Sequence, residues 1–137
     1  VFIGNWDAST YGKDLKLKYS NDSYVHIFDP IYDLKLLYRY RSNASAYVHG
    51  HSAGGTNPSL VEMMHFDVPI LAYDCIYNRE TLNNAGDFFT DVSSLQEILS
   101  SGFFNSVANV ERNKEYAVTE YTWSNIYAKY LSSIENV

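Results

Sequence analysis

The stretch that decides the fold of this chain is YVHGHSAGGTNPSLVEMMHFDVPILAYD, residues 47–74. An apolar run at residues 46–49 predicts a strand, and a glycine-containing loop follows it. Pro58 predicts the start of a helix over residues 58–66, because its fixed φ suits the first turn and its missing N–H is not needed there. The continuous apolar run at residues 69–73 predicts a strand that is buried on both faces.

The same alternation of short apolar runs and helical segments extends along the rest of the chain. Further strands are predicted at residues 1–4, 24–28 and 87–90, and further helices at 11–19, 31–42, 78–85, 93–101 and from about 106 onward. We expect Gly86 to end a helix in the left-handed conformation, Ser93 to open a capping box and Thr122 to cap the last helix. This order predicts one α/β domain with a Rossmann-like, doubly wound parallel sheet.

Composition excludes several classes of function. The 137 residues are 46% hydrophobic, enough for one globular core, and the net charge of −6 argues against a nucleic-acid partner. The one cysteine, Cys75, excludes an internal disulfide, and no apolar run approaches the roughly 20 residues of a membrane span. The single cysteine and the lack of an apolar span favour a location in the cytoplasm. The chain starts at Val1 inside an apparent strand, so we expect a piece of a larger protein.

The glycine loop predicts a ligand site. Ligands of open α/β sheets bind beyond the carboxyl ends of the strands, and Gly54 and Gly55 let the backbone come close to a ligand. The helix that begins near Pro58 is expected to present free N–H groups to an anion, most plausibly a phosphate. Neither a Walker-type loop nor the triple-glycine dinucleotide motif is present. Glu62 on this helix needs a partner, and we favour a ribose diol. The alternatives are that Glu62 faces solvent or pairs with a cation of the protein.

These residues carry a resemblance. Residues 54–64, GGTNPSLVEMM, and 67–72, DVPILA, resemble the segment E-G-F-G-L-x-x-x-E-A-M-A-x-G-x-P-V in the C-terminal domain of retaining, nucleotide-sugar-dependent glycosyltransferases of GT-B fold. Residues 121–128, YTWSNIYA, resemble that family's closing helix, F-x-W-x-x-I-A, which returns to the N-terminal domain. Residues 49–62 and 78–80 look most like a family-4-type bacterial subgroup that includes rhamnosyltransferases of capsule or O-antigen synthesis.

The resemblance covers nearly the whole chain and implies a donor-binding role. Glu62 matches the glutamate that binds the nucleotide ribose, and base contacts fall on Phe28, Ile31 and Tyr32. The diphosphate and sugar would contact His51, Ser52, Gly54, Gly55, Thr56, Asn57 and Arg79. The implied donor is a dTDP-, UDP- or GDP-linked hexose or deoxyhexose, for example dTDP-rhamnose, with no cofactor and no metal in this domain.

Two departures from the family limit what the resemblance implies. Gly54 stands where many relatives have the first of two glutamates, eight positions before Glu62, so recognition of the donor sugar is in doubt. The similarity begins at the second strand of the family's C-terminal domain, so its first strand and the acceptor-binding N-terminal domain are not covered. The fragment alone is expected to be inactive. A glycan or lipid-linked glycan acceptor would bind the other domain at the inner face of the membrane, and apolar surface at the boundary favours a homo-oligomer.

Other interpretations stay open beside this one. His49 and His51 are too few for a convincing zinc site and are equally compatible with hydrogen bonding to the ligand and with a structural role. Arg79 can bind the diphosphate or pair with Glu62 or Glu80, and the pair with Glu80 is slightly favoured. A hydrolase is not supported, because the Gly-x-Ser-x-Gly elbow is absent. The alternative function is a non-catalytic, degenerate glycosyltransferase-like scaffold.

Overall fold

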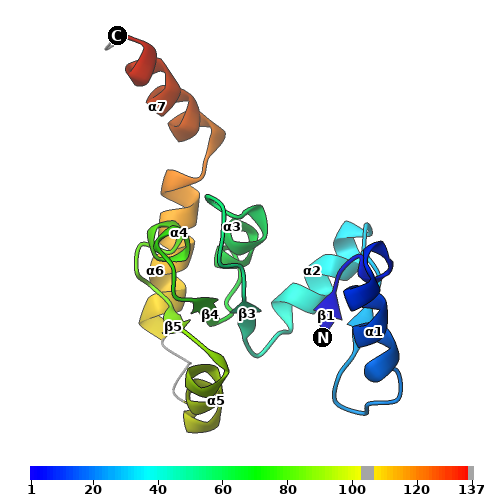
Figure 1. Ribbon diagram of the computed structural model, residues 1–137. Coiled ribbons are helices and arrows are strands. Elements are labelled where there is room, and N and C mark those ends of the chain that lie inside the picture. The colour runs from blue at the N-terminus through cyan, green and yellow to red at the C-terminus, as the bar shows by residue number, and fades with distance from the viewer. Residues whose placement is uncertain (103–106, 136–137) are drawn as a thin grey trace. The chain divides into compact units, whose positions relative to one another are not determined.

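The computed structural model describes residues 1–102 and 107–135, which form an α/β structure. The chain divides into two compact units, Val1–Tyr40 and Arg41–Val137. The described residues contain five strands, seven α-helices and one 3-10 helix (Figure 1). Every pair of neighbouring strands is parallel, as the alternation of strands and helices predicts.

The first unit is built around a two-stranded sheet of β1 (Phe2–Ile3) and β2 (Ile27–Phe28), followed by the start of α2 (Leu34–Ser42). Between the strands lie the 3-10 helix η1 (Trp6–Ala8) and α1 (Thr10–Lys18). The Trp6 indole donates to the main-chain oxygen of Phe28 at 2.9 Å, and a Cβ on Gly12 would lie 2.2 Å from the Trp6 oxygen. Gly12 therefore permits the close packing of α1 on η1.

The second unit contains a three-stranded sheet in the order β3 (Tyr47–His49), β4 (Ile70–Tyr73) and β5 (Asp87–Phe89), which Figure 1 shows side by side. Tyr47 pairs with Ile70, and Leu71 pairs with Asp87. The helices of this unit are α3 (Pro58–Met64), α4 (Ile76–Thr81), α5 (Val92–Ser101), α6 (Val107–Glu120) and α7 (Trp123–Glu135).

The core of the second unit lies between the central strand β4 and the helices α3, α4 and α6. Its buried residues are Leu60, Met63, Met64, Val68, Ile70, Ala72, Leu82 and Ala117. Full burial of a leucine side chain contributes about 1.5–3 kcal/mol, so Leu60 and Leu82, both 0% exposed, anchor α3 and the end of α4. Because three of its side chains lie in this core, α3 is held in place after the glycine loop.

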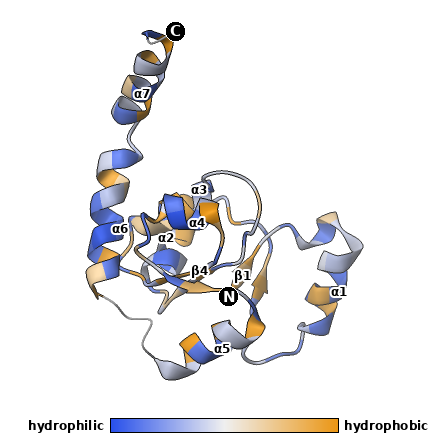
Figure 2. Cartoon of the chain, turned by 60° about the vertical axis from the view of Figure 1, so that its left-hand side comes forward, coloured by the Kyte–Doolittle hydropathy of each residue, from blue (hydrophilic) through white to orange (hydrophobic). Residues whose placement is uncertain are grey.

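Helix α7 has no buried residue, although hydrophobic residues recur along it in Figure 2. Trp123 is 86% exposed and Ile134 is 70% exposed. None of the described helices combines the length and the apolar character that crossing a membrane requires.

The predicted elements are present, but their boundaries and capping residues differ in places. The strands predicted at 1–4 and 24–28 are only two residues long, and the described strands form two separate small sheets. Thr122 does cap α7, because its hydroxyl accepts from the Asn125 N–H at 3.3 Å. The predicted capping box is displaced: Asp91 is the N-cap of α5, and its partner is Ser94.

The prediction that Gly86 ends a helix in the left-handed conformation is wrong. Helix α4 stops at Thr81, and the left-handed residues are Asn83 (φ 45°) and Asn84 (φ 57°). Asparagine tolerates this conformation better than most residues, so the chain can turn before it reaches the glycine. Gly86 serves close packing instead, since a Cβ there would lie 2.9 Å from a methyl group of Leu82.

Candidate functional site

The glycine loop, residues 50–57, joins the carboxyl end of β3 to α3. Gly54 has a φ of +97°, which explains glycine at that position. A Cβ at Gly50 or at Gly55 would meet no atom within 4 Å, and neither residue has a positive φ. Packing of the described chain therefore requires glycine at neither position, and the backbone beside both is open to an incoming group.

The N–H groups at the start of α3 are already hydrogen-bonded within the chain. The Asn57 side chain accepts from the Ser59 N–H at 2.9 Å, and the Asn57 main-chain oxygen accepts from Leu60 and Val61. Pro58 has no N–H. The prediction of free N–H groups at this helix start is therefore wrong, because Asn57 caps the helix. An anion at this site would have to use the N–H groups of the preceding loop.

Glu62 is paired with a protein cation. Its Oε2 lies 2.5 Å from an Arg41 nitrogen, and the Glu62 side chain remains 53% exposed. Tyr47 lies near this pair. Burial raises the pKa of Tyr47, and the charge of Glu62 raises it further while that of Arg41 opposes the rise. Glu62 thus has the partner that its place on a packed helix requires, while half of its side-chain surface is accessible to a ligand.

The two histidines at the end of β3 have different surroundings. His49 is only 5% exposed, its Nδ1 lies 3.1 Å from the Tyr47 hydroxyl oxygen, and its buried Nε2 has no hydrogen-bond partner in the described chain. Burial lowers the pKa of His49, and the nearby His51 lowers it further, so His49 is neutral at pH 7. The His51 side chain is exposed, with its ring centroid 6.0 Å from that of His49.

A buried asparagine holds the loop against the sheet. The side-chain nitrogen of Asn78, on α4, donates to the main-chain oxygens of His51 and Tyr73, both at 2.8 Å. Asn78 is 3% exposed, and these two bonds satisfy both N–H groups of its side-chain amide inside the protein. From this segment the sequence predicts Arg79 alone as a candidate site residue, because the contacts of Asn78 depend on the loop and β4 meeting in space.

Arg79 is held by Asp74, so the predicted pair with Glu80 is wrong. Its Nε and Nη2 lie 2.5 and 2.8 Å from the two carboxylate oxygens of Asp74, and its guanidinium stacks 4.3 Å from the centroid of the Phe88 ring. The hydrogen bonds from Arg79 lower the pKa of Asp74. A bidentate pair of this kind fixes the guanidinium plane. The predicted contact of Arg79 with a diphosphate would compete with this pair.

Tyr121 brings the closing segment to the glycine loop. Its hydroxyl donates to the main-chain oxygen of Thr81 at 3.2 Å, and the Thr56 side chain lies close enough to the hydroxyl to lower its pKa. Burial raises the pKa of Tyr121. The sequence predicted both segments as family motifs, but the contact between Tyr121 and Thr56 appears only in the tertiary structure.

The predicted base contacts lie in the first unit. Phe28 is half-buried in β2, with its ring centroid 5.4 Å from that of Tyr40, and its main-chain oxygen accepts from Gly4 and Trp6. Ile31 is half-buried and Tyr32 is 88% exposed in the segment before α2. Binding of a base by these three residues stays a prediction. The main-chain oxygen of Phe28 already has two donors.

The loop residues His51, Ser52, Gly54, Gly55 and Thr56 are all exposed, and Asn57 is half-buried. These residues form one continuous surface segment between β3 and α3. Within residues 1–102 and 107–135, no three histidine, cysteine, aspartate or glutamate side chains gather closely enough to hold a metal ion.

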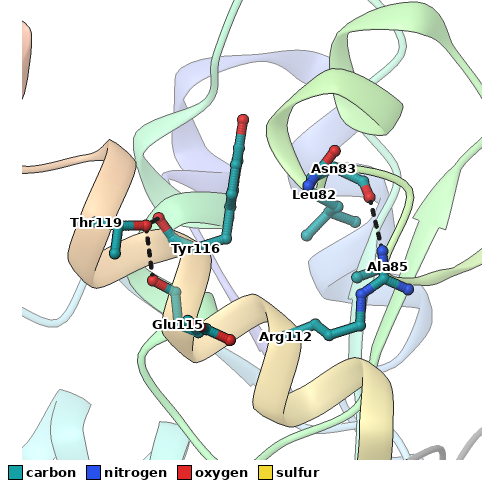
Figure 3. Close-up of a pocket in the computed structure, with 7 residues that line it drawn as sticks. All are labelled: Leu82, Asn83, Ala85, Arg112, Glu115, Tyr116 and Thr119. Carbon is teal, nitrogen blue, oxygen red and sulfur yellow. Dashed lines mark hydrogen bonds between the residues drawn. The ribbon is translucent and has the colours of Figure 1, made fainter.

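A separate surface pocket of about 240 Å³ lies between α6 and the turn after α4 (Figure 3). Figure 3 shows Arg112 reaching from α6 to the main-chain oxygen of Asn83, at 3.4 Å. The lining residues are Leu82, Asn83, Ala85, Arg112, Glu115, Tyr116 and Thr119. None of them belongs to the glycine loop.

No protein-family model matches the sequence, and no curated protein matches it.

Proposed function

We propose that this chain is the donor-binding part of a glycosyltransferase, with a doubly wound, GT-B-type C-terminal domain. The site would bind a nucleoside diphosphate sugar, such as dTDP-rhamnose, for transfer to a polysaccharide acceptor bound by another domain. The proposal rests on the resemblance of residues 54–72 to the donor-binding motif and on the placement of that motif at the carboxyl end of β3.

The observation that carries the proposal is the open space beside Gly50 and Gly55. Glycine loses more backbone entropy on folding than other residues do. Because neither packing nor a positive φ explains Gly50 and Gly55, we infer that another molecule approaches the backbone closely there. Thr56 and Ser52 add hydroxyl groups to the same exposed loop. A diphosphate, which needs several donors in a small space, suits backbone N–H groups and hydroxyl groups arranged in this way.

Glu62 is the proposed ribose contact. A carboxylate that keeps half of its side-chain surface accessible while Arg41 fixes its position can accept hydrogen bonds from a diol. Arg41 then acts as a positioning residue, because it holds the carboxylate in one orientation and neutralises its charge.

Calorimetric titration of the chain with dTDP, UDP, GDP and a nucleoside monophosphate tests the proposal. We expect one diphosphate to bind best, and Glu62→Ala to weaken it about ten- to hundredfold, as for a lost hydrogen bond to a charged group. Glu97→Ala removes an exposed carboxylate on α5 and is the matched control.

Arg41→Ala separates the ribose contact from the ion pair. It breaks the same pair while keeping the Glu62 carboxylate, so a much smaller loss of affinity than in Glu62→Ala assigns the effect to the ligand. Equal losses would assign it to the structure of the pair. No binding of any nucleotide by the folded chain would overturn the proposal.

The alternative proposal is a non-catalytic scaffold. It is supported by the departure at Gly54 and by helix α7, which leaves Trp123 and Ile134 exposed. A scaffold would bind no nucleotide, so nucleotide binding in the calorimetric titration discriminates between the two proposals. A scaffold would also lose a protein partner on Trp123→Ala.

A further inference from the structure

The His49 side chain has a buried nitrogen without a partner. His49 is 5% exposed, and its Nε2 makes no hydrogen bond within the described residues. A buried polar group that stays unsatisfied costs about 1–3 kcal/mol. Such groups are few in native proteins and mark a bound water, an ion or a functional contact. His49 stands at the last position of β3, directly before the glycine loop.

The contact with Tyr47 connects the position of the His49 proton to the direction of one hydrogen bond. Burial raises the pKa of the Tyr47 hydroxyl, so it keeps its proton at pH 7, and this hydroxyl can either donate to Nδ1 of His49 or accept from it. An Nδ1 that accepts this bond carries no hydrogen. Because His49 is neutral, its single proton then lies on Nε2, which becomes a buried donor without an acceptor.

The surroundings indicate what kind of acceptor is missing. The exposed ring of His51 lies beside His49, and the open backbone of Gly50 follows immediately. The carboxyl end of a parallel strand is also where ligands of open α/β sheets bind. An oxygen of a ligand held by the loop would satisfy Nε2–H.

We propose that His49 donates a hydrogen bond from Nε2 to a phosphoryl oxygen of a diphosphate held by residues 50–57, with Tyr47 fixing the ring. The proposal rests on the donor-binding function proposed above, and it names the contact that orients the diphosphate. A neutral imidazole can donate this bond from Nε2–H, so the contact does not require the buried ring to be protonated.

Two variants separate the roles of the two ring nitrogens. His49→Asn places an amide oxygen near the position of Nδ1, so it can still accept from Tyr47 but offers no donor at Nε2. His49→Gln reaches to the position of Nε2 with an amide N–H but does not reproduce Nδ1. Affinities of the chain for inorganic pyrophosphate, dTDP, UDP and GDP are measured by calorimetry, and thermal unfolding is measured without ligand.

We expect His49→Asn to unfold within a few degrees of the unmodified chain but to bind the anion about tenfold more weakly, as for one lost hydrogen bond. His49→Gln should retain the affinity within about threefold. Unchanged anion affinity in His49→Asn would overturn the proposal, because the ring would then serve structure alone.

Nitrogen-15 NMR of the unmodified chain tests the contact even where a variant does not fold. We expect the Nε2–H tautomer of His49 and a shift of the Nε2 resonance on adding pyrophosphate. The Nδ1–H tautomer, or an Nε2 resonance that no phosphate compound moves, would overturn the proposal and leave a buried water as the partner. A shift with pyrophosphate, combined with no preference for any nucleoside diphosphate and no effect of Glu62→Ala, would support the His49 contact and refute the donor-binding function.

Discussion

The hydroxyl of Tyr121 donates a hydrogen bond to the main-chain oxygen of Thr81, 3.2 Å away and 40 residues earlier in the chain. The Thr56 side chain lies near the same hydroxyl and lowers its pKa. Tyr121 thus connects the corner between α6 and α7 to the end of α4 and to the glycine loop. Thr81 is 2% exposed, so leaving its main-chain oxygen without a hydrogen-bond donor would lower the stability of the fold.

Tyr121→Phe is expected to lower the free energy of unfolding by about 1 kcal/mol, because it leaves the Thr81 oxygen without this donor. Urea denaturation measures the change. Tyr127→Phe is the matched control, since Tyr127 is 65% exposed on α7 and its loss should change stability by less than about 0.5 kcal/mol. Equal effects of the two variants would contradict a stabilising role for the bond.

Gly54 and Gly55 are expected to respond differently to alanine. Gly54→Ala should cost about 1–2 kcal/mol of stability, because φ is +97° at that residue. Gly55→Ala should change stability by less than about 0.5 kcal/mol, since its Cβ meets open space. If a diphosphate approaches this backbone, Gly55→Ala should nevertheless weaken binding about tenfold, as measured by calorimetry. Unchanged affinity would show that the ligand does not approach Gly55.

Asn57 is expected to stabilise α3 through its cap. Asn57→Ala should lower stability by about 1 kcal/mol, because the Ser59 N–H loses its acceptor. Asn57→Asp keeps a side-chain oxygen at the N-cap and should be nearly neutral. Thermal unfolding of the two variants measures the difference. An Asp variant as unstable as the Ala variant would mean that another property of Asn57 is responsible.

The pair of Asp74 and Arg79 is expected to make stability depend on pH under acidic conditions. The pKa of Asp74 is below its ordinary value of 3.8 in the folded chain, so the unfolded chain binds the proton first as the pH falls. The stabilisation is complete above about pH 3.8 and is lost as the pH falls through the lower, folded-state pKa.

Asp74→Asn should therefore be less stable than the unmodified chain at neutral pH, and the difference should narrow below about pH 3.8. Urea midpoints over this range measure it. Asp14→Asn, which alters an exposed carboxylate on α1 outside the ion pairs of the described residues, is the control. A difference that stays constant down to the lowest pH would argue against this linkage.

Local sequence rules predicted the elements better than their ends. The N-cap at Thr122 and the helix start at Pro58 depend on residues within one turn, and both are confirmed. Gly86 failed as a helix end because Asn83 and Asn84 turn the chain earlier. Ser93 failed as a cap because Asp91, two residues before it, starts α5. Where several residues are suitable for one role, packing against the sheet decides which is used.

The order of strands and helices, and the loop that follows β3, follow from the sequence alone, because periodicity, proline and glycine act on neighbouring residues. The hydrogen-bond and ion-pair partners of the site residues cannot be predicted from the sequence in this way. Arg41 meets Glu62 across 21 residues, and Tyr121 meets Thr81 across 40, so each contact depends on how whole helices pack. Many cations and carboxylates of the chain could pair equally well, and only the distances set by the packed core choose among them.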